Sequence, residues 1–315
     1  MRSNRPLTAA ALWLALAGGA AAQFRGVLVS AAQLGDLKKD GPRTVVLNLD
    51  ANAGDAARRI RAAGFELYYW IEVGRNPAMA EAHPEWMASL QGHPEWRRFF
   101  PTAPQPGPGA VVKNYPWVPV LYRESFDAHL GRVAALLKDV PAPEGIFLND
   151  LQGAPSACGC GNILCRWTTD YGPIRTATRL GPEAAAQFAA AVARLAPQAR
   201  IIPVWTTECE EHDKAERCGG VGCFTGACWV EYTKQFLPLA AQCETLAVLA
   251  PYRAFGRDAG WVKRSIESFQ PRGIAADRLI AVVEDGDSSL AGAAGRLVSR
   301  MKIAQDWQPR IVETR

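Results

Sequence analysis

Short apolar segments and longer amphipathic segments alternate along most of this chain. Apolar runs bounded by polar or turn residues predict seven strands, at 24–30, 44–49, 66–73, 145–150, 200–205, 245–249 and 278–283. Apolar residues at helical spacing between them predict helices at 55–63, 125–137, from 181 onward, and at 229–239, 261–269 and 288–304. This order is typical of parallel strands joined by crossover helices.

A closed (β/α)8 barrel of the TIM type is the fold that this alternation favours. The eighth strand is assigned to the short segment Arg310–Val312, and a barrel whose last strand is missing or distorted is the alternative. The chain from Gln23 to Arg315 is interpreted as one domain. Long loops are expected after strands three, four and five, including 74–123 and 151–181. These loops leave the carboxyl ends of strands, where such barrels build their active sites.

The first 22 residues have the pattern of a secretory signal peptide. Arg2 and Arg5 precede the apolar run 7–17, which is too short to span a bilayer, and the alanines at 20–22 fit a cleavage site. We therefore expect an exported protein, periplasmic or secreted, that begins at Gln23. An uncleaved anchor is the alternative.

The charge and the hydropathy of the chain argue against nucleic acid and against a membrane span. Without Arg2 and Arg5 the formal charge falls from +4 to +2, and no basic run follows. A chain that is nearly neutral is a poor match for nucleic acid. No later stretch is apolar enough for a membrane helix, so no membrane span is expected in the mature chain.

Acidic residues lie at or just after the ends of several predicted strands. They are Asp50, Glu72, Asp150, Glu208, Glu284 and Asp285. Asp150 is the most informative, because it ends the very apolar strand 145–150. Glycoside hydrolysis needs two carboxyl groups around one glycosidic bond, and neighbouring strands would bring Asp150 and Glu208 to about 5–5.5 Å. The alternative is structural: rim carboxylates also cap helices or pair with arginine.

Three segments carry a resemblance to a known family. They are Tyr69–Val73, the motif His83-Pro84-Glu85-Trp86 and the strand that ends in Asn149-Asp150. Together they resemble the bacterial glycosyl-hydrolase-like barrels, which are distantly similar to the alpha-amylases. The resemblance implies Asp150 as nucleophile, Glu208 as acid/base and an acid at Glu284 or Asp285. Asn149 departs from it, because a second acid is usual there.

Aromatic residues at or after strands three to five suit a saccharide, because their faces stack on sugar rings. Trp70, Trp86 and Trp205 belong to this group, and Glu72, His83 and Asn149 are the polar candidates beside them. The alternative is that the tryptophans only fix loops to the barrel.

All eight cysteines lie between residues 158 and 243. In an exported chain disulfides are the first expectation, joining the loop of 158–165 to the loop of 209–228. The close spacing of Cys158, Cys160 and Cys165, with Cys209 or His212 as a fourth ligand, allows a zinc site as the alternative.

The sequence thus favours an exported glycosidase that acts on an oligo- or polysaccharide and uses no cofactor. A saccharide-binding barrel without catalysis is the second hypothesis. A metal-binding protein that uses the cysteine cluster is the third.

Overall fold

The structure, a computed structural model, describes most of the chain between residues 23 and 313. The described ranges are 23–36, 41–87, 105–120, 123–151, 181–206, 238–250, 252–253, 258–267, 269–284, 293, 295–301 and 308–313.

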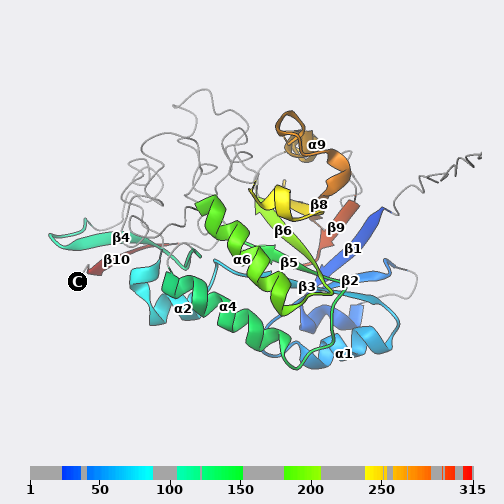
Figure 1. The fold of residues 1–315 in the computed structure, drawn as a ribbon, viewed down its shortest axis with the longest axis horizontal. Coiled ribbons are helices and arrows are strands. Elements are labelled where there is room, and N and C mark those ends of the chain that lie inside the picture. Colours follow the sequence, from blue (N-terminus) through cyan, green and yellow to red (C-terminus); the bar gives the residue numbers. More distant parts are fainter. Residues whose placement is uncertain are drawn as a thin grey trace, which may run out of the picture.

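Eight parallel strands close into a barrel, which confirms the predicted fold class (Figure 1). In order around the barrel they are β1 (Phe24–Val29), β2 (Thr44–Asn48), β3 (Glu66–Glu72), β5 (Gly145–Asn149), β6 (Arg200–Thr206), β7 (Leu246–Leu249), β8 (Leu279–Glu284) and β9 (Gly295–Ser299). Strand β9 pairs with β1, so the barrel has no open edge.

The α-helices are α1 (Gly54–Ala62), α2 (Pro77–Ala82), α4 (Arg123–Leu137), α6 (Gly181–Leu195) and α9 (Gly260–Glu267). Short 3-10 helices cover η1 (Ala31–Asp36), η2 (Pro84–Trp86), η5 (Gln270–Arg272) and η6 (Ala276–Arg278). The helix expected at 229–239 lies mostly outside the described residues, which include a helical stretch at 238–242.

Most barrel strands bury both of their faces, as their apolar sequences require, while β9 buries one face and half-buries the other. Side chains such as Leu28, Val46 and Phe147 fill the interior of the barrel. The alternate positions, such as Leu47 and Ile146, pack outward against the helices. Because side chains alternate along a strand, these two sets also show which residues face the axis at the strand ends.

Aromatic rings fill the interior near the amino ends of the strands. Phe24 meets Tyr68 edge-on, with ring centroids 5.4 Å apart, and both lie beside Phe147. Gly145 makes room for this packing, because a Cβ there would lie 2.7 Å from the Tyr68 ring. With this end filled by rings, the carboxyl ends of the strands are left as the place for a site.

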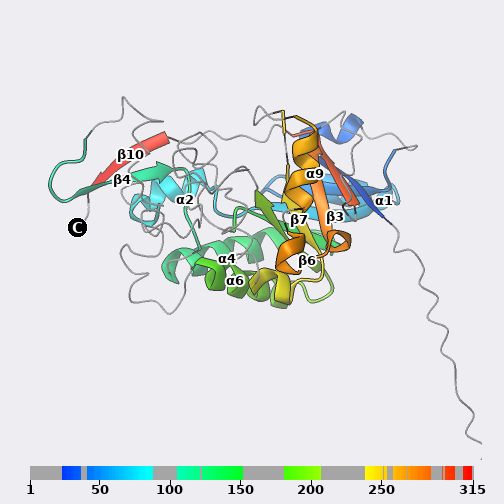
Figure 2. The same cartoon turned by 90° about the horizontal axis from the view of Figure 1, so that it is seen from above.

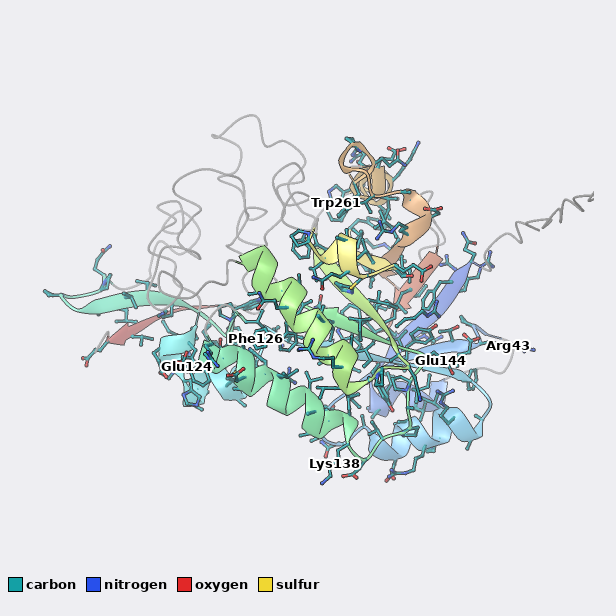
Figure 3. All side chains as sticks on the ribbon, viewed as in Figure 1. Arg43, Glu124, Phe126, Lys138, Glu144 and Trp261 are labelled. Carbon is teal, nitrogen blue, oxygen red and sulfur yellow. The ribbon has the colours of Figure 1, made fainter. Side chains whose placement is uncertain are left out.

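Helices α4 and α6 pack side by side on the barrel. Phe126 of α4 and Phe188 of α6 meet edge-on at 5.2 Å. In Figure 3, Arg43 and Glu144 mark the end where strands begin, and Glu124 marks the beginning of α4 at the other end. Ser125 lies in the first turn of α4 and donates to the Pro119 carbonyl oxygen at 2.6 Å.

The prediction for the last part of the barrel was wrong. The segment expected as a helix at 288–304 supplies the closing strand β9, and Arg310–Val312 belongs to β10 (Gln308–Glu313), outside the barrel. Strand β10 pairs with β4 (Ala110–Tyr115), which lies in the long loop after β3 and was not predicted. Figures 1 and 2 show this two-stranded sheet and α2 beyond one end of the barrel.

Candidate functional site

The site is built where β3 and β5 end side by side. Glu72 and Asn149 are partners in the register of the two strands. Trp70 and Phe147, two residues earlier on each strand, face the barrel interior. By alternation Glu72 and Asn149 also face the axis, one layer nearer the carboxyl-end mouth.

Asp150 comes next, and its backbone leaves the strand conformation. Strict alternation would point its side chain outward, but Asp150 has a φ of 57°. Among the described residues other than glycine it alone has a positive φ. Aspartate tolerates this left-handed conformation better than most residues. The turn brings the Asp150 carboxyl group into hydrogen-bonding contact with that of Glu72.

The two carboxyl groups, which we call the Glu72–Asp150 pair, lie in contact. Burial and the negative charge of Glu72 raise the pKa of Asp150 well above its usual range. The hydrogen bond between Asp150 and Glu72 raises the pKa of Asp150 further, and the positive charge of Arg75 lowers it. Two ionised carboxylates in contact repel each other, so the contact favours the protonated form of Asp150.

Glu72 is held by nitrogen donors on both of its oxygens. Its Oε1 accepts from Trp70 Nε1 at 2.7 Å, and its Oε2 accepts from Asn149 Nδ2 at 2.8 Å. The Arg132 guanidinium, from α4, donates to the Glu72 backbone carbonyl oxygen. These contacts fix the position of Glu72 at the end of β3.

A further carboxyl group lies across the mouth. Glu284 ends β8, and β8 stands four strands from β3 in the closed order of eight, so the two strands lie opposite each other. Ile280 and Val282 face the interior, which places Glu284 on the same side of its strand. The Arg253 backbone N–H donates to Glu284 Oε2 at 2.8 Å.

Other residues predicted from sequence make contacts of a different kind. Trp205 is 1 % exposed and packs in the layer between strands and helices, so no ligand can stack on it there. His83 stacks on Trp86 with ring centroids 3.7 Å apart, in the segment that carries α2 and η2. Asp50 is exposed, and its Oδ1 accepts from the Asn52 backbone N–H at 2.8 Å, the turn contact of a structural carboxylate.

Several candidates lie outside the described residues. They are Glu208, Asp285, His212 and the cysteines Cys158, Cys160, Cys165 and Cys209. The disulfides expected between the two cysteine groups, and the alternative zinc site, lie there too. Cys243 is described: it is a free, buried thiol whose pKa is raised to about 11 by burial.

Sequence reasoning missed the two arginines beside the pair. Arg132 lies three residues after His129 and one before Val133, both buried residues of α4. A charged residue next to a buried helix stripe is a signal that could have drawn attention to it. Arg75 follows β3 directly in the chain, and no pattern marked it.

Two other buried titratable groups serve the fold. His129 is fully buried, and burial lowers its pKa to about 4. Its Nε2 lies 2.8 Å from the Val118 carbonyl oxygen, so the neutral ring donates there. Lys113 donates to the carbonyl oxygens of Glu85 and Met87, both at 3.0 Å, and joins η2 to β4.

No described helix is long and apolar enough to cross a membrane.

Comparison with solved structures finds distant similarities to several enzymes. The glycoside hydrolase domain of PelA from Pseudomonas aeruginosa is 14% identical, with a TM-score of 0.47 over 89% of this chain and 95% of that chain. A chitinase from Chromobacterium violaceum is 9% identical, with a TM-score of 0.45 over 84% and 68%. The endo-1,4-beta-D-mannanase from Thermotoga petrophila is 10% identical, with a TM-score of 0.44 over 88% of each chain.

The first of these three structures is a glycoside hydrolase domain, the second a chitinase and the third a mannanase. No protein-family model matches the chain, and no curated protein matches it. The case for chemistry therefore rests on the carboxyl groups of this chain.

Proposed function

We propose that this protein is an exported glycoside hydrolase that cleaves an oligo- or polysaccharide at the mouth of its barrel without a cofactor. The observation that carries the proposal is the Glu72–Asp150 pair. It places a carboxyl group that keeps its proton at the carboxyl-end rim of a closed barrel, where such folds place their active sites.

In this proposal Asp150 is the acid that protonates the leaving oxygen. The resemblance to glycosyl-hydrolase-like barrels implies a nucleophile at this position, but a nucleophilic carboxyl group has to be ionised. Asp150 is in contact with an acidic neighbour and has a raised pKa, which suits proton donation better than attack. The acid role is therefore the one that the contacts favour.

The second carboxylate comes from another strand end. Glu284, opposite β3, and Glu208, after β6, are the two candidates. As the glycosidic C–O bond breaks, the leaving oxygen takes the proton of Asp150. Water supplies a hydroxyl group to the anomeric carbon, and its other proton passes to a carboxylate, so one water is consumed for each bond.

The test is release of reducing ends from a panel of polysaccharides and chromogenic glycosides by wild type and by Asp150→Asn. We expect turnover by wild type and a loss of about 10²–10⁴-fold in the variant, the range for a positioned acid. Glu208→Gln and Glu284→Gln, compared on the same substrate, identify the second group. Asp50→Asn is the matched control, because it removes an exposed carboxylate from a neighbouring strand end.

Two results would overturn the proposal. Equal turnover by wild type and Asp150→Asn would remove the pair from the chemistry. Saccharide binding without turnover, measured by calorimetry across the panel, would favour a binding protein built on the same barrel.

A further inference from the structure

Either Glu72 or Asp150 can carry the proton of the Glu72–Asp150 pair. The hydrogen bonds to Glu72 decide which carboxyl group is protonated. A protonated Glu72 would carry its hydrogen on one oxygen, and both oxygens already face N–H groups. Trp70 Nε1 lies 2.7 Å from Oε1, and Asn149 Nδ2 lies 2.8 Å from Oε2. Hydrogen bonds from N–H donors stabilise the ionised form of a carboxyl group.

We infer that Trp70 and Asn149 are positioning residues that hold Glu72 as the anion and leave Asp150 as the protonated member of the pair. The catalytic use of this arrangement rests on the proposed function, since an acid catalyst needs its proton on the group that meets the substrate. The assignment of the proton itself does not. Trp70 had been expected to stack on a sugar. It is instead 2 % exposed, inside the barrel and stacked on Phe147, so its indole N–H is its functional part.

Asn149 makes the second contact that favours an ionised Glu72. Asn149 is 4 % exposed, and its Nδ2 donates to Glu72 Oε2 at 2.8 Å. An aspartate here would add a third carboxyl group and remove one donor. The amide keeps the charge of the pair at one and directs the proton to Asp150.

Other charged groups act on the pair from the elements packed around it. Arg75, after β3, favours ionisation of Asp150 and opposes the assignment. Arg132, on α4, interacts favourably with the charge of Glu72 and supports it. Glu284 stands on the opposite strand β8, and Glu208 lies outside the described residues. The two direct donors are the contacts that distinguish Glu72 from Asp150.

The test observes the carboxyl carbons by ¹³C NMR in protein labelled at the side-chain carboxyls of aspartate and glutamate. Signals are assigned with Asp150→Asn and Glu72→Gln. In wild type near neutral pH we expect the Asp150 carboxyl carbon to have the chemical shift of a protonated carboxyl group. The Glu72 carboxyl carbon should have the chemical shift of an ionised one. The reverse assignment in wild type would overturn the inference without any further variant.

Trp70→Phe then removes the N–H and keeps an aromatic ring to stack on Phe147. We expect the ratio of protonated Asp150 to protonated Glu72 to fall at least about tenfold, since a hydrogen bond to a charged group is lost. Trp261→Phe, a buried tryptophan on α9, is the matched control and leaves both signals in place. Unchanged signals in Trp70→Phe would overturn the role of Trp70.

The measurement needs no substrate, which separates the two proposals. Signals as expected with no hydrolysis on any glycoside would reject the proposed function and keep the proton assignment. Hydrolysis that depends on Asp150, together with a protonated Glu72 in the NMR measurement, would keep the proposed function and reject the proton assignment.

Discussion

The shared proton has a consequence for stability that can be measured without a substrate. The folded chain keeps a proton on the Glu72–Asp150 pair at pH values where the unfolded chain has lost it. Over that window the unfolded state binds fewer protons, so the free energy of unfolding falls as pH rises. The window begins near 3.8, the ordinary pKa of aspartate, and ends at the raised pKa of Asp150.

Asp150→Asn removes this dependence, because an amide cannot ionise. Its Nδ2 can still donate to Glu72, so the contact is preserved. One proton per molecule gives at most about 1.4 kcal/mol per pH unit. The variant should therefore gain stability relative to wild type by up to about 1.4 kcal/mol for each pH unit inside the window. Over two units this is a sizeable part of the roughly 5–15 kcal/mol that holds a typical domain folded.

Urea unfolding followed by tryptophan fluorescence provides the assay, at intervals of about one pH unit from about pH 4 to about pH 8. The informative quantity is the difference in unfolding free energy between the two proteins. Asp50→Asn is the control: it shows how the loss of one exposed carboxylate at this end of the barrel changes the unfolding free energy. A difference between Asp150→Asn and wild type that stays constant with pH would refute the shared proton.

Three further predictions concern the fold around the site. Trp205→Ala should lower the free energy of unfolding by about 3–5 kcal/mol in urea titrations, because the side chain is 1 % exposed, while KM for any saccharide substrate stays unchanged. Gly145→Ala should cost about 1–3 kcal/mol in the same titrations, because the new methyl group meets the Tyr68 ring at 2.7 Å. Burial lowers the pKa of Lys113 to about 8 from an ordinary 10.5, so the unfolded chain binds more protons between these values. Unfolding free energy should therefore rise across that window relative to Lys113→Met, and parallel pH profiles would contradict this.

The sequence contained enough information for the barrel, because most strands are buried on both faces. Runs such as those of β3 and β5 are too apolar to be half-exposed, and the structure confirms both strands within a residue or two. The closing strand β9 was missed for the opposite reason. The strand itself has only two large aliphatic residues, Leu297 and Val298. The alanines of the surrounding segment 288–304 made it resemble a helix. Pairing with β1 on one side and β8 on the other makes it a strand.

The second sheet was beyond local reasoning as well. Strands β4 and β10 are about two hundred residues apart in the sequence and pair only with each other among the described strands. Arg310 shows how such a contact forms: its guanidinium lies 3.4 Å from the Tyr115 ring centroid and 2.8 Å from Glu81. Sequence separation hides both partners, so the segment was assigned to the barrel instead.

At the site, the sequence identified the two acidic strand ends but did not predict that their carboxyl groups are in contact. Asp150 was singled out because it ends an apolar strand, and Glu72 because it ends the strand before. Their contact depends on the register of β3 with β5 and on the left-handed backbone of Asp150. Neither can be derived from residue order alone, because alternation by itself would have separated the two side chains.

The central claim is that Asp150 supplies a proton to the leaving oxygen, and a series of aryl glycosides of one sugar tests it most directly. The series keeps the sugar constant and varies the acidity of the leaving phenol. The account predicts that Asp150→Asn costs about 10²–10⁴-fold in kcat/KM on the poorest leaving group and progressively less on better ones, which need little protonation. An equal loss on every member of the series would contradict it, because that is the result expected of a nucleophile.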